Sequence, residues 1–134
     1  MRTRAKICGI TRVEDVHAVV NAGADAIGFV FYPPSPRAVT AEQAAQLVQA
    51  IAPYVQVVGL FVNHSANEIQ DILQTVHLDI VQFHGDETPE QCQTIAQQVG
   101  RRWYKAIQVK PDLDVVVEIQ RYQDAGASAV LLDA

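Results

Sequence analysis

Two reactive side chains stand near opposite ends of the sequence, each at the end of an apolar segment. Cys8 ends the segment that begins at Arg4, and Asp133 ends the segment that begins at Ala129. If both segments are parallel strands of one sheet, the two side chains lie at the same edge of that sheet. Open α/β sheets and β/α barrels place their chemistry at this edge. A thiol and a carboxyl brought together there predict an acid–base pair.

Cys8 has a cation two residues before it. Because side chains alternate between the two faces of a strand, Lys6 and Cys8 share a face. A neighbouring ammonium group favours the thiolate form of a cysteine, and a thiolate is a competent general base or nucleophile. The equally favoured alternative is that Cys8 is a small buried hydrophobe. Cys92 falls on the apolar stripe of a helical segment, so the structural interpretation is preferred there.

Asp133 follows the apolar run Val130-Leu-Leu directly, and strand packing explains an aspartate poorly at this position. A carboxyl that is desolvated keeps its proton near neutral pH and can act as a general acid. The alternative is a loop cap or a carboxylate in water near the chain end. We favour the general acid.

Three more polar side chains are candidates for substrate binding. The loop 32–37 contains three prolines that stiffen it, and its Arg37 suits a carboxylate or phosphate, although an exposed loop arginine is an equal alternative. Gln82 and His84 share a face at the end of a strand segment, and His84 is the most site-like histidine. The other histidines are expected at the surface: His17, His64 and His77. No metal-binding spacing and no glycine-rich phosphate loop is present.

Apolar runs and helical periodicity alternate along the whole chain, which predicts repeated strand–helix units and a parallel sheet. The expected strands are 5–7, 26–31, 55–62, 78–83, 103–109 and 128–132. Capping boxes predict where helices begin. The expected N-caps are Thr11, Thr40, Ser65, Thr88 and, as a plain cap, Asp112.

Composition restricts the class of protein. The 134 residues form a single domain, residues 1–134, with 49% hydrophobic residues and a net charge of −5. That charge, without a dense basic cluster, argues against a nucleic-acid partner and favours small molecules. No segment reaches about 18 consecutive apolar residues, so we expect no membrane partner and a cytoplasmic location. Two cysteines without a metal or disulfide spacing are expected to be free thiols.

Six segments together resemble the phosphoribosylanthranilate isomerase family of tryptophan biosynthesis, in the same order along the whole chain. They are Lys6-Ile-Cys-Gly-Ile-Thr11, Gly23-Ala-Asp-Ala-Ile-Gly-Phe-Val-Phe31, Ser35-Pro-Arg37, Val58-Gly-Leu-Phe-Val62, Gln82-Phe-His-Gly-Asp-Glu87 and Leu131-Leu-Asp133. Six ordered matches that include both reactive positions are far more specific than any one of them.

The resemblance implies an α/β fold of the (β/α)8 TIM-barrel family, here about the first six strands and five helices. It also implies an Amadori rearrangement of N-(5-phosphoribosyl)anthranilate without cofactor or metal. Asp133 would protonate the furanose ring oxygen, and Cys8 would remove the C2′ proton. Arg37 would hold the anthranilate carboxylate, and His84, Lys6 and Gln82 would line the pocket.

The sequence departs from the family in length. Family members continue through two further βα units that bind the substrate phosphate, and a full barrel needs roughly 200 residues or more. We therefore expect this chain to be part of a longer barrel, and to be inactive or nearly so by itself.

Two rival functions remain open. A lyase or aldolase of the same barrel type would use Lys105 as a Schiff-base amine. The preferred interpretation of Lys105 is a structural lysine inside the barrel, paired with a carboxylate. A non-catalytic fragment that associates with a second copy through its open barrel edges is the other rival.

Overall fold

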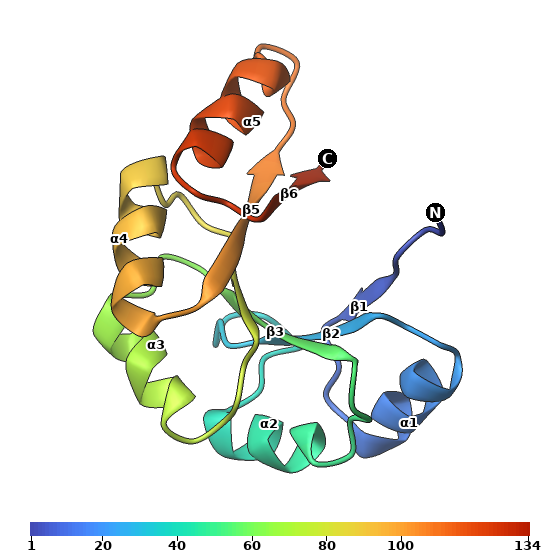
Figure 1. Ribbon diagram of the computed structural model, residues 1–134. Helices are drawn as coiled ribbons and strands as arrows, with labels where there is room; N and C mark the ends of the chain where they lie inside the picture. Colours follow the sequence, from blue (N-terminus) through green and yellow to red (C-terminus); the bar gives the residue numbers. More distant parts are fainter.

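A computed structural model describes residues 1–134 as one six-stranded parallel sheet and five helices. The strands follow one another across the sheet in sequence order, from β1 to β6. Figure 1 shows that the sheet curves into an open arc with the helices along its outer side. The elements are β1 (Lys6–Cys8), α1 (Val13–Asn21), β2 (Ala26–Val30), α2 (Ala41–Val48), β3 (Gln56–Phe61), α3 (Ala66–Leu73), β4 (Ile80–Phe83), α4 (Pro89–Val99), β5 (Arg102–Gln108), α5 (Val115–Asp124) and β6 (Ala129–Asp133). The six strands, five helices and barrel-type order expected from the sequence are therefore confirmed.

Strand residues divide into an outer set that faces the helices and an inner set that faces the hollow of the arc. The outer set joins the main hydrophobic core with the helices: Ile27, Phe29, Val57, Phe61, Val81, Phe83, Trp103 and Ile107. The inner set includes four buried residues that do not belong to that cluster: Val30, Val58, Leu60 and Ala106. Burial on both faces explains why the central strands have nearly continuous apolar sequences.

Three of the expected helix starts are confirmed. Thr40, Ser65 and Thr88 each accept a hydrogen bond from the backbone N–H three residues later, and the side chain of that later residue accepts one from the cap backbone. Each reciprocal pair satisfies two donors that the first helical turn leaves free. Pro89 follows the third cap at the first helical position, where its missing N–H costs nothing.

The other two expected starts are wrong. Arg12, not Thr11, is the N-cap of α1, and it makes no side-chain cap because a guanidinium only donates and cannot accept a backbone N–H. The second wrong start is the one expected at Asp112. A turn occupies this position instead, closed by a hydrogen bond from the Leu113 N–H to the Lys110 carbonyl at 3.1 Å. Helix α5 therefore begins two residues late, and Asp114 replaces Asp112 as its cap.

The two outermost strands, β1 and β6, each have one neighbour. Their outer-face side chains remain accessible, with Ile7 41% and Leu132 57% exposed. Figure 1 shows both chain ends on the open side of the arc. None of the helices combines the length and apolar character needed to cross a membrane.

Candidate active site

Strand register places Cys8 and Asp133 on the inner face of the arc. Cys8 pairs with Gly28, and Asp133 pairs with Gln108. When the pairing is followed from strand to strand, both residues fall in the inner set, because alternate residues share a face. Each is the last residue of its strand. The structure therefore brings the two residues to the same face and the same carboxyl edge.

The thiol of Cys8 lies against a glycine on the neighbouring strand. A Cβ atom at Gly28 would lie 2.9 Å from the Sγ atom of Cys8, closer than real contacts allow. Glycine at this position therefore leaves the room that the thiol occupies. Cys8 is half-buried and free of any disulfide.

Arg37 lies beside Cys8, although its own loop follows β2. Its Nη1 donates to the carbonyl oxygen of Cys8 at 3.2 Å. The guanidinium packs over Gly9, where a Cβ atom would lie 2.7 Å from the Cζ atom of Arg37. Gly9 also has φ +86°, a conformation that favours glycine. The exposed guanidinium keeps its remaining N–H groups free for an anion.

A line of polar contacts crosses the inner face from β1 to β6. The Nζ of Lys6 donates to Oε1 of Gln82, and Nε2 of Gln82 lies 3.1 Å from Nδ1 of His84. Nε2 of His84 lies 3.5 Å from Oδ2 of Asp133. Four of the residues expected at the site are thus connected to one another.

Burial changes the electrostatics at the Lys6 end of this line. Desolvation lowers the pKa of the Lys6 ammonium, and the neighbouring Cys8 opposes this in part. The Nζ of Lys6 lies 5.2 Å from the centre of the Tyr104 ring, within range of a cation–π interaction. Burial, with a smaller contribution from Cys8, raises the pKa of Tyr104 to about 12.

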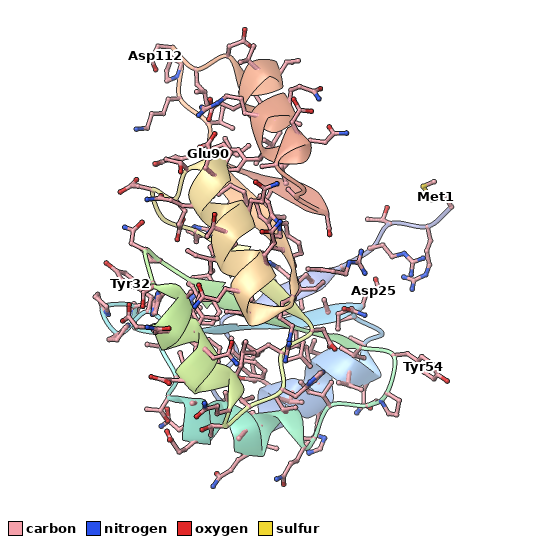
Figure 2. The ribbon with its side chains drawn as sticks, turned by 60° about the vertical axis from the view of Figure 1, so that its left-hand side comes forward. Met1, Asp25, Tyr32, Tyr54, Glu90 and Asp112 are labelled. Atoms are coloured by element: carbon pink, nitrogen blue, oxygen red, sulfur yellow. The ribbon has the colours of Figure 1, made fainter.

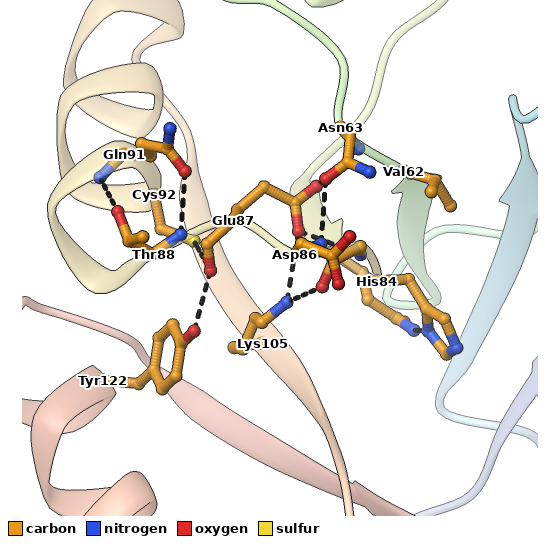
Figure 3. A network of polar contacts seen from close by, with 12 residues as sticks. Val62, Asn63, His84, Asp86, Glu87, Thr88, Gln91, Cys92, Lys105 and Tyr122 are labelled. Atoms are coloured by element: carbon orange, nitrogen blue, oxygen red, sulfur yellow. Dashed lines mark hydrogen bonds and ion pairs between the residues drawn. The ribbon is translucent and has the colours of Figure 1, made fainter.

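A second polar cluster lies on the opposite, helix-facing side of β4 and β5 (Figure 3). Nζ of Lys105 lies 3.1 Å from Oε1 of Glu87, and the two residues are 4% and 3% exposed. Nζ also donates to the carbonyl of Gly85. The expected pairing of Lys105 with a carboxylate is confirmed, and it favours a structural lysine over a Schiff-base amine.

The expected position of Lys105 inside the barrel is wrong. Lys105 alternates with the inward Tyr104, pairs in register with Phe83 of the helix-side core, and lies 5.7 Å from the centre of the Tyr122 ring on α5. Successive side chains of a strand point to opposite faces of the sheet, so only one of Tyr104 and Lys105 can face inward.

Glu87 connects the loops that follow β3 and β4 with helix α5. Its two carboxylate oxygens accept the backbone N–H groups of Asn63 at 2.8 Å and of Gly85 at 2.9 Å. Its carbonyl accepts the Tyr122 hydroxyl at 2.7 Å (Figure 3). The backbone N–H of His84 is bound to the Phe61 carbonyl at 2.8 Å. The segment that carries His84 is therefore held from both sides.

Two expectations about exposure require correction. Asp133 was expected to be desolvated, but its side chain is 58% exposed because β6 has a neighbour on one side only. His64 was expected at the surface, but its ring packs edge-on against Phe61 and both ring nitrogens have backbone partners. His17 and His77 are exposed, as expected.

Cys92 is fully buried on α4, so its structural interpretation is confirmed. Burial raises the pKa of its thiol to about 12, and the negative charge of the nearby Glu87 carboxylate contributes to the increase. At neutral pH this thiol is therefore protonated and unreactive.

A cleft of about 730 Å³ opens beside His84 and Asp133. Figure 2 labels two of its lining residues, Tyr32 after β2 and Asp112 after β5. Lys110 also lines it, and neither this lysine nor Tyr104 was identified from the sequence. The strand alternation that points Lys105 outward is the signal that identifies Tyr104. No group of three or more His, Cys, Asp or Glu side chains is arranged to hold a metal ion.

Parallel βα units in sequence order, with a thiol and a carboxyl at the carboxyl edge of the first and sixth strands, define a protein of the β/α-barrel class. Comparison with known proteins gives the particular family. The family model for N-(5'phosphoribosyl)anthranilate (PRA) isomerase matches residues 5–134, and the chain belongs to this family.

Two relatives illustrate how close the similarity is. The N-(5'-phosphoribosyl)anthranilate isomerase of Acinetobacter calcoaceticus is 72% identical over 134 residues, which cover 100% of this chain and 63% of the relative. The protein of the same name from Ralstonia nicotianae is 52% identical, over 99% of this chain and 57% of the relative. The chain thus spans about three fifths of the length of these relatives.

Solved structures give the same result. The phosphoribosyl anthranilate isomerase of Thermotoga maritima is 39% identical with a TM-score of 0.87, over 98% of this chain and 62% of that protein. A structure of such an isomerase in complex with reduced 1-(o-carboxyphenylamino)-1-deoxyribulose 5-phosphate is also 39% identical, with a TM-score of 0.88. It covers 98% of this chain and 65% of that protein.

Proposed function

We propose that this chain carries the acid–base pair of an isomerase that rearranges N-(5-phosphoribosyl)anthranilate to 1-(2-carboxyphenylamino)-1-deoxyribulose 5-phosphate. The observation that carries the proposal is the convergence of Cys8 and Asp133 on one face at one carboxyl edge. Membership of the isomerase family supports it. Tryptophan biosynthesis is the pathway that this reaction serves.

The proposed reaction begins with protonation of the furanose ring oxygen by Asp133. The ring C–O bond breaks, and the amine nitrogen forms a Schiff base to C1′. Cys8, as the thiolate, then removes the proton from C2′, which gives an enolamine. Proton gain at C1′ and loss of the hydroxyl proton at C2′ give the ketone. No redox partner is needed, because the steps only relocate protons and bonds within one molecule.

Substrate binding in this proposal uses the remaining polar groups of the inner face. Arg37 binds the anthranilate carboxylate with the guanidinium N–H groups that do not contact Cys8, since its planar fork suits a carboxylate. Lys6, Gln82 and His84 line the pocket next to the acid and the base. No cofactor takes part.

The test uses two proteins, because the chain covers 63% of its Acinetobacter relative. One is the chain itself. The other is a hybrid in which residues 1–134 replace the matching segment of that relative. Chromatography follows conversion of N-(5-phosphoribosyl)anthranilate. We expect turnover by the hybrid and little by the chain alone, in which β1 and β6 each lack a second neighbouring strand. A folded hybrid without turnover contradicts the proposal.

A second copy of the chain is a further proposed partner. The edge strands β1 and β6 each have one unpaired side, and Ile7 and Leu132 expose apolar surface there. Unpaired apolar edges favour strand pairing between molecules. Sedimentation velocity of the chain should show dimers or larger species whose proportion increases with concentration, and a monomer at all concentrations would exclude this partner.

A cytoplasmic location belongs to the same proposal. Both cysteines are free thiols, as is usual for proteins of a reducing compartment. Cell fractionation with antibodies against the chain is the test, and recovery from the periplasmic or membrane fraction would contradict it.

A further inference from the structure

Gln82 occupies a central position on the inner face, between a cation and an imidazole. It is 2% exposed, so its amide has no water to satisfy it. Its oxygen accepts from Nζ of Lys6, and its nitrogen lies 3.1 Å from Nδ1 of His84. Both ends of one buried amide are thus in use.

The chemistry of these groups fixes the direction of each hydrogen bond. An ammonium group only donates, so the amide oxygen of Gln82 must face Lys6. The amide NH2 then faces His84, and because it only donates, Nδ1 must be the unprotonated, accepting nitrogen. The Nζ of Lys6 lies over the Tyr104 ring, and the face of an aromatic ring attracts the charged, ammonium form of the lysine. In neutral His84 the proton therefore lies on Nε2.

The second ring nitrogen of His84 faces the carboxylate proposed as the general acid. Nε2 is 3.5 Å from Oδ2 of Asp133, long for a direct hydrogen bond. Catalytic hydrogen bonds are often long in the absence of substrate and shorten when it binds. An N–H at this nitrogen can hold one carboxylate oxygen and leave the other for the substrate.

We propose that Lys6, acting through Gln82, fixes His84 as the Nε2–H tautomer so that His84 positions Asp133. His84 is then a positioning residue that acts through Asp133. The catalytic consequence rests on the proposed isomerase function, whereas the tautomer itself does not. This inference gives one task to three side chains, Lys6 on β1, Gln82 on β4 and His84 directly after β4.

His64 provides an internal reference for the same tautomer. Its Nδ1 lies 3.1 Å from the backbone nitrogen of Val62, which only donates. Its Nε2 lies 3.1 Å from the carbonyl oxygen of Phe31, which only accepts. Backbone groups thus set His64 as Nε2–H, independently of any side-chain assignment.

The experiment is 15N NMR of the chain labelled at histidine, at about pH 8.5, well above the ordinary histidine pKa of about 6.5. We expect His84 to show the same pattern as His64, with an accepting Nδ1 and a protonated Nε2. The exposed His17 should show an averaged pattern, whereas His77, whose Nε2 lies 2.7 Å from Oδ1 of Asp79, should be protonated at Nε2. An Nδ1–H tautomer or an averaged pattern at His84 would overturn the inference.

Gln82→Glu is the decisive variant because a carboxylate can only accept. It keeps the pairing with Lys6 and requires a proton on Nδ1 of His84, so a new Nδ1–H signal should appear at His84 while His64 is unchanged. An unchanged His84 would overturn the inference. If loss of the His64 pattern reports unfolding, Lys6→Met replaces this variant. It should give a mixed His84 tautomer, and a pure Nε2–H form would be the contrary result.

Turnover of the hybrid separates this inference from the proposed function. Gln82→Glu in the hybrid should lower kcat and leave KM within about twofold, since His84 acts on the acid. An inactive wild-type hybrid in which His84 is Nε2–H would reject the isomerase function and retain the tautomer. An active hybrid with the Nδ1–H tautomer would reject this inference and retain the isomerase function.

Discussion

The two polar clusters lie on opposite faces of the same strands and differ in how completely they are satisfied. On the outer face, Glu87 and Lys105 are almost fully buried, and both carboxylate oxygens of Glu87 have partners. On the inner face, Gln82 is buried, but the contacts continue to His84 and Asp133, whose side chains are 36% and 58% exposed. One cluster is complete without a ligand, and the other leaves polar groups free at its end.

This difference indicates that the outer cluster stabilises the structure, whereas the inner cluster has polar groups available for a substrate. Buried polar networks rigidify a structure only when every member is satisfied. Glu87 meets this condition and holds the loop that follows β4. Because β4 also carries Gln82 inward, the support of one face is transmitted to the reactive face by the strand itself.

The largest effect is expected at the exposed end of the inner cluster. Asp133→Asn in the hybrid should lower kcat by about 10²–10⁴-fold, the usual contribution of a general acid. Asp112→Asn is the matched control, because Asp112 lines the same cleft and has no assigned part in the reaction. Steady-state assays on both variants give the result. Equal rates for the two variants would remove Asp133 from the mechanism.

The next effect concerns stability and the outer cluster. Lys105→Met should lower the free energy of unfolding by about 3 kcal/mol, since it leaves the Glu87 carboxylate buried without its cation. Urea unfolding measures the change.

Arg121→Met is the control for this substitution. It removes an ion pair with Glu118 in which the arginine is 51% exposed, and it should change stability far less than Lys105→Met, because solvent screens an exposed pair. If the two substitutions cost the same, the outer cluster does not provide the support assigned to it.

Alkaline pH should weaken the fold through groups with raised pKa values. Burial raises the pKa of the Cys92 thiol from 9.0 to about 12 in the folded chain. Its contribution to stability is therefore complete below about pH 9 and is lost as pH rises toward about 12. Tyr122, raised from 10.0 to about 12 mainly by burial, acts in the same direction. Urea unfolding between these pH values should show falling stability.

Cys92→Ala tests the origin of this alkaline effect. The variant lacks the thiol, so its stability should fall less steeply over the same pH range than that of the wild type. A wild-type profile that is flat across the range would contradict the assignment.

The smallest expected effects are at the helix caps. Thr40→Ala removes a side chain that accepts from the Gln43 N–H at 3.1 Å, and it should cost about 1 kcal/mol. Thr11→Ala should be nearly neutral, since Thr11 caps nothing. Thermal unfolding of both variants distinguishes them, and an equal loss would restore the capping box that the sequence suggested for α1.

Local chemistry in the sequence predicted the strands, three helix caps and the shared face of Gln82 and His84, because each depends on residues close together in the chain. The start of α5 was missed because a turn of the backbone competes with the cap at Asp112. The face of Lys105 was missed because it follows from the register between β4 and β5, which no single segment contains.

Exposure was the other quantity that the sequence did not provide. Asp133 follows an apolar run typical of a buried strand, yet β6 is an edge strand. His64 sits in a polar loop sequence, yet contacts with Phe31 and Phe61 leave it half-buried. Both depend on neighbours distant in sequence.

The two cysteines allow the most direct test of the claim that the inner face carries the chemistry and the outer core does not. The measurement is kcat of the hybrid with Cys8→Ser, compared with the hybrid with Cys92→Ala. We expect the first to lose about 10²–10⁴-fold, as for a general base, and the second to retain kcat within about twofold. Near-normal turnover in folded Cys8→Ser would contradict the account.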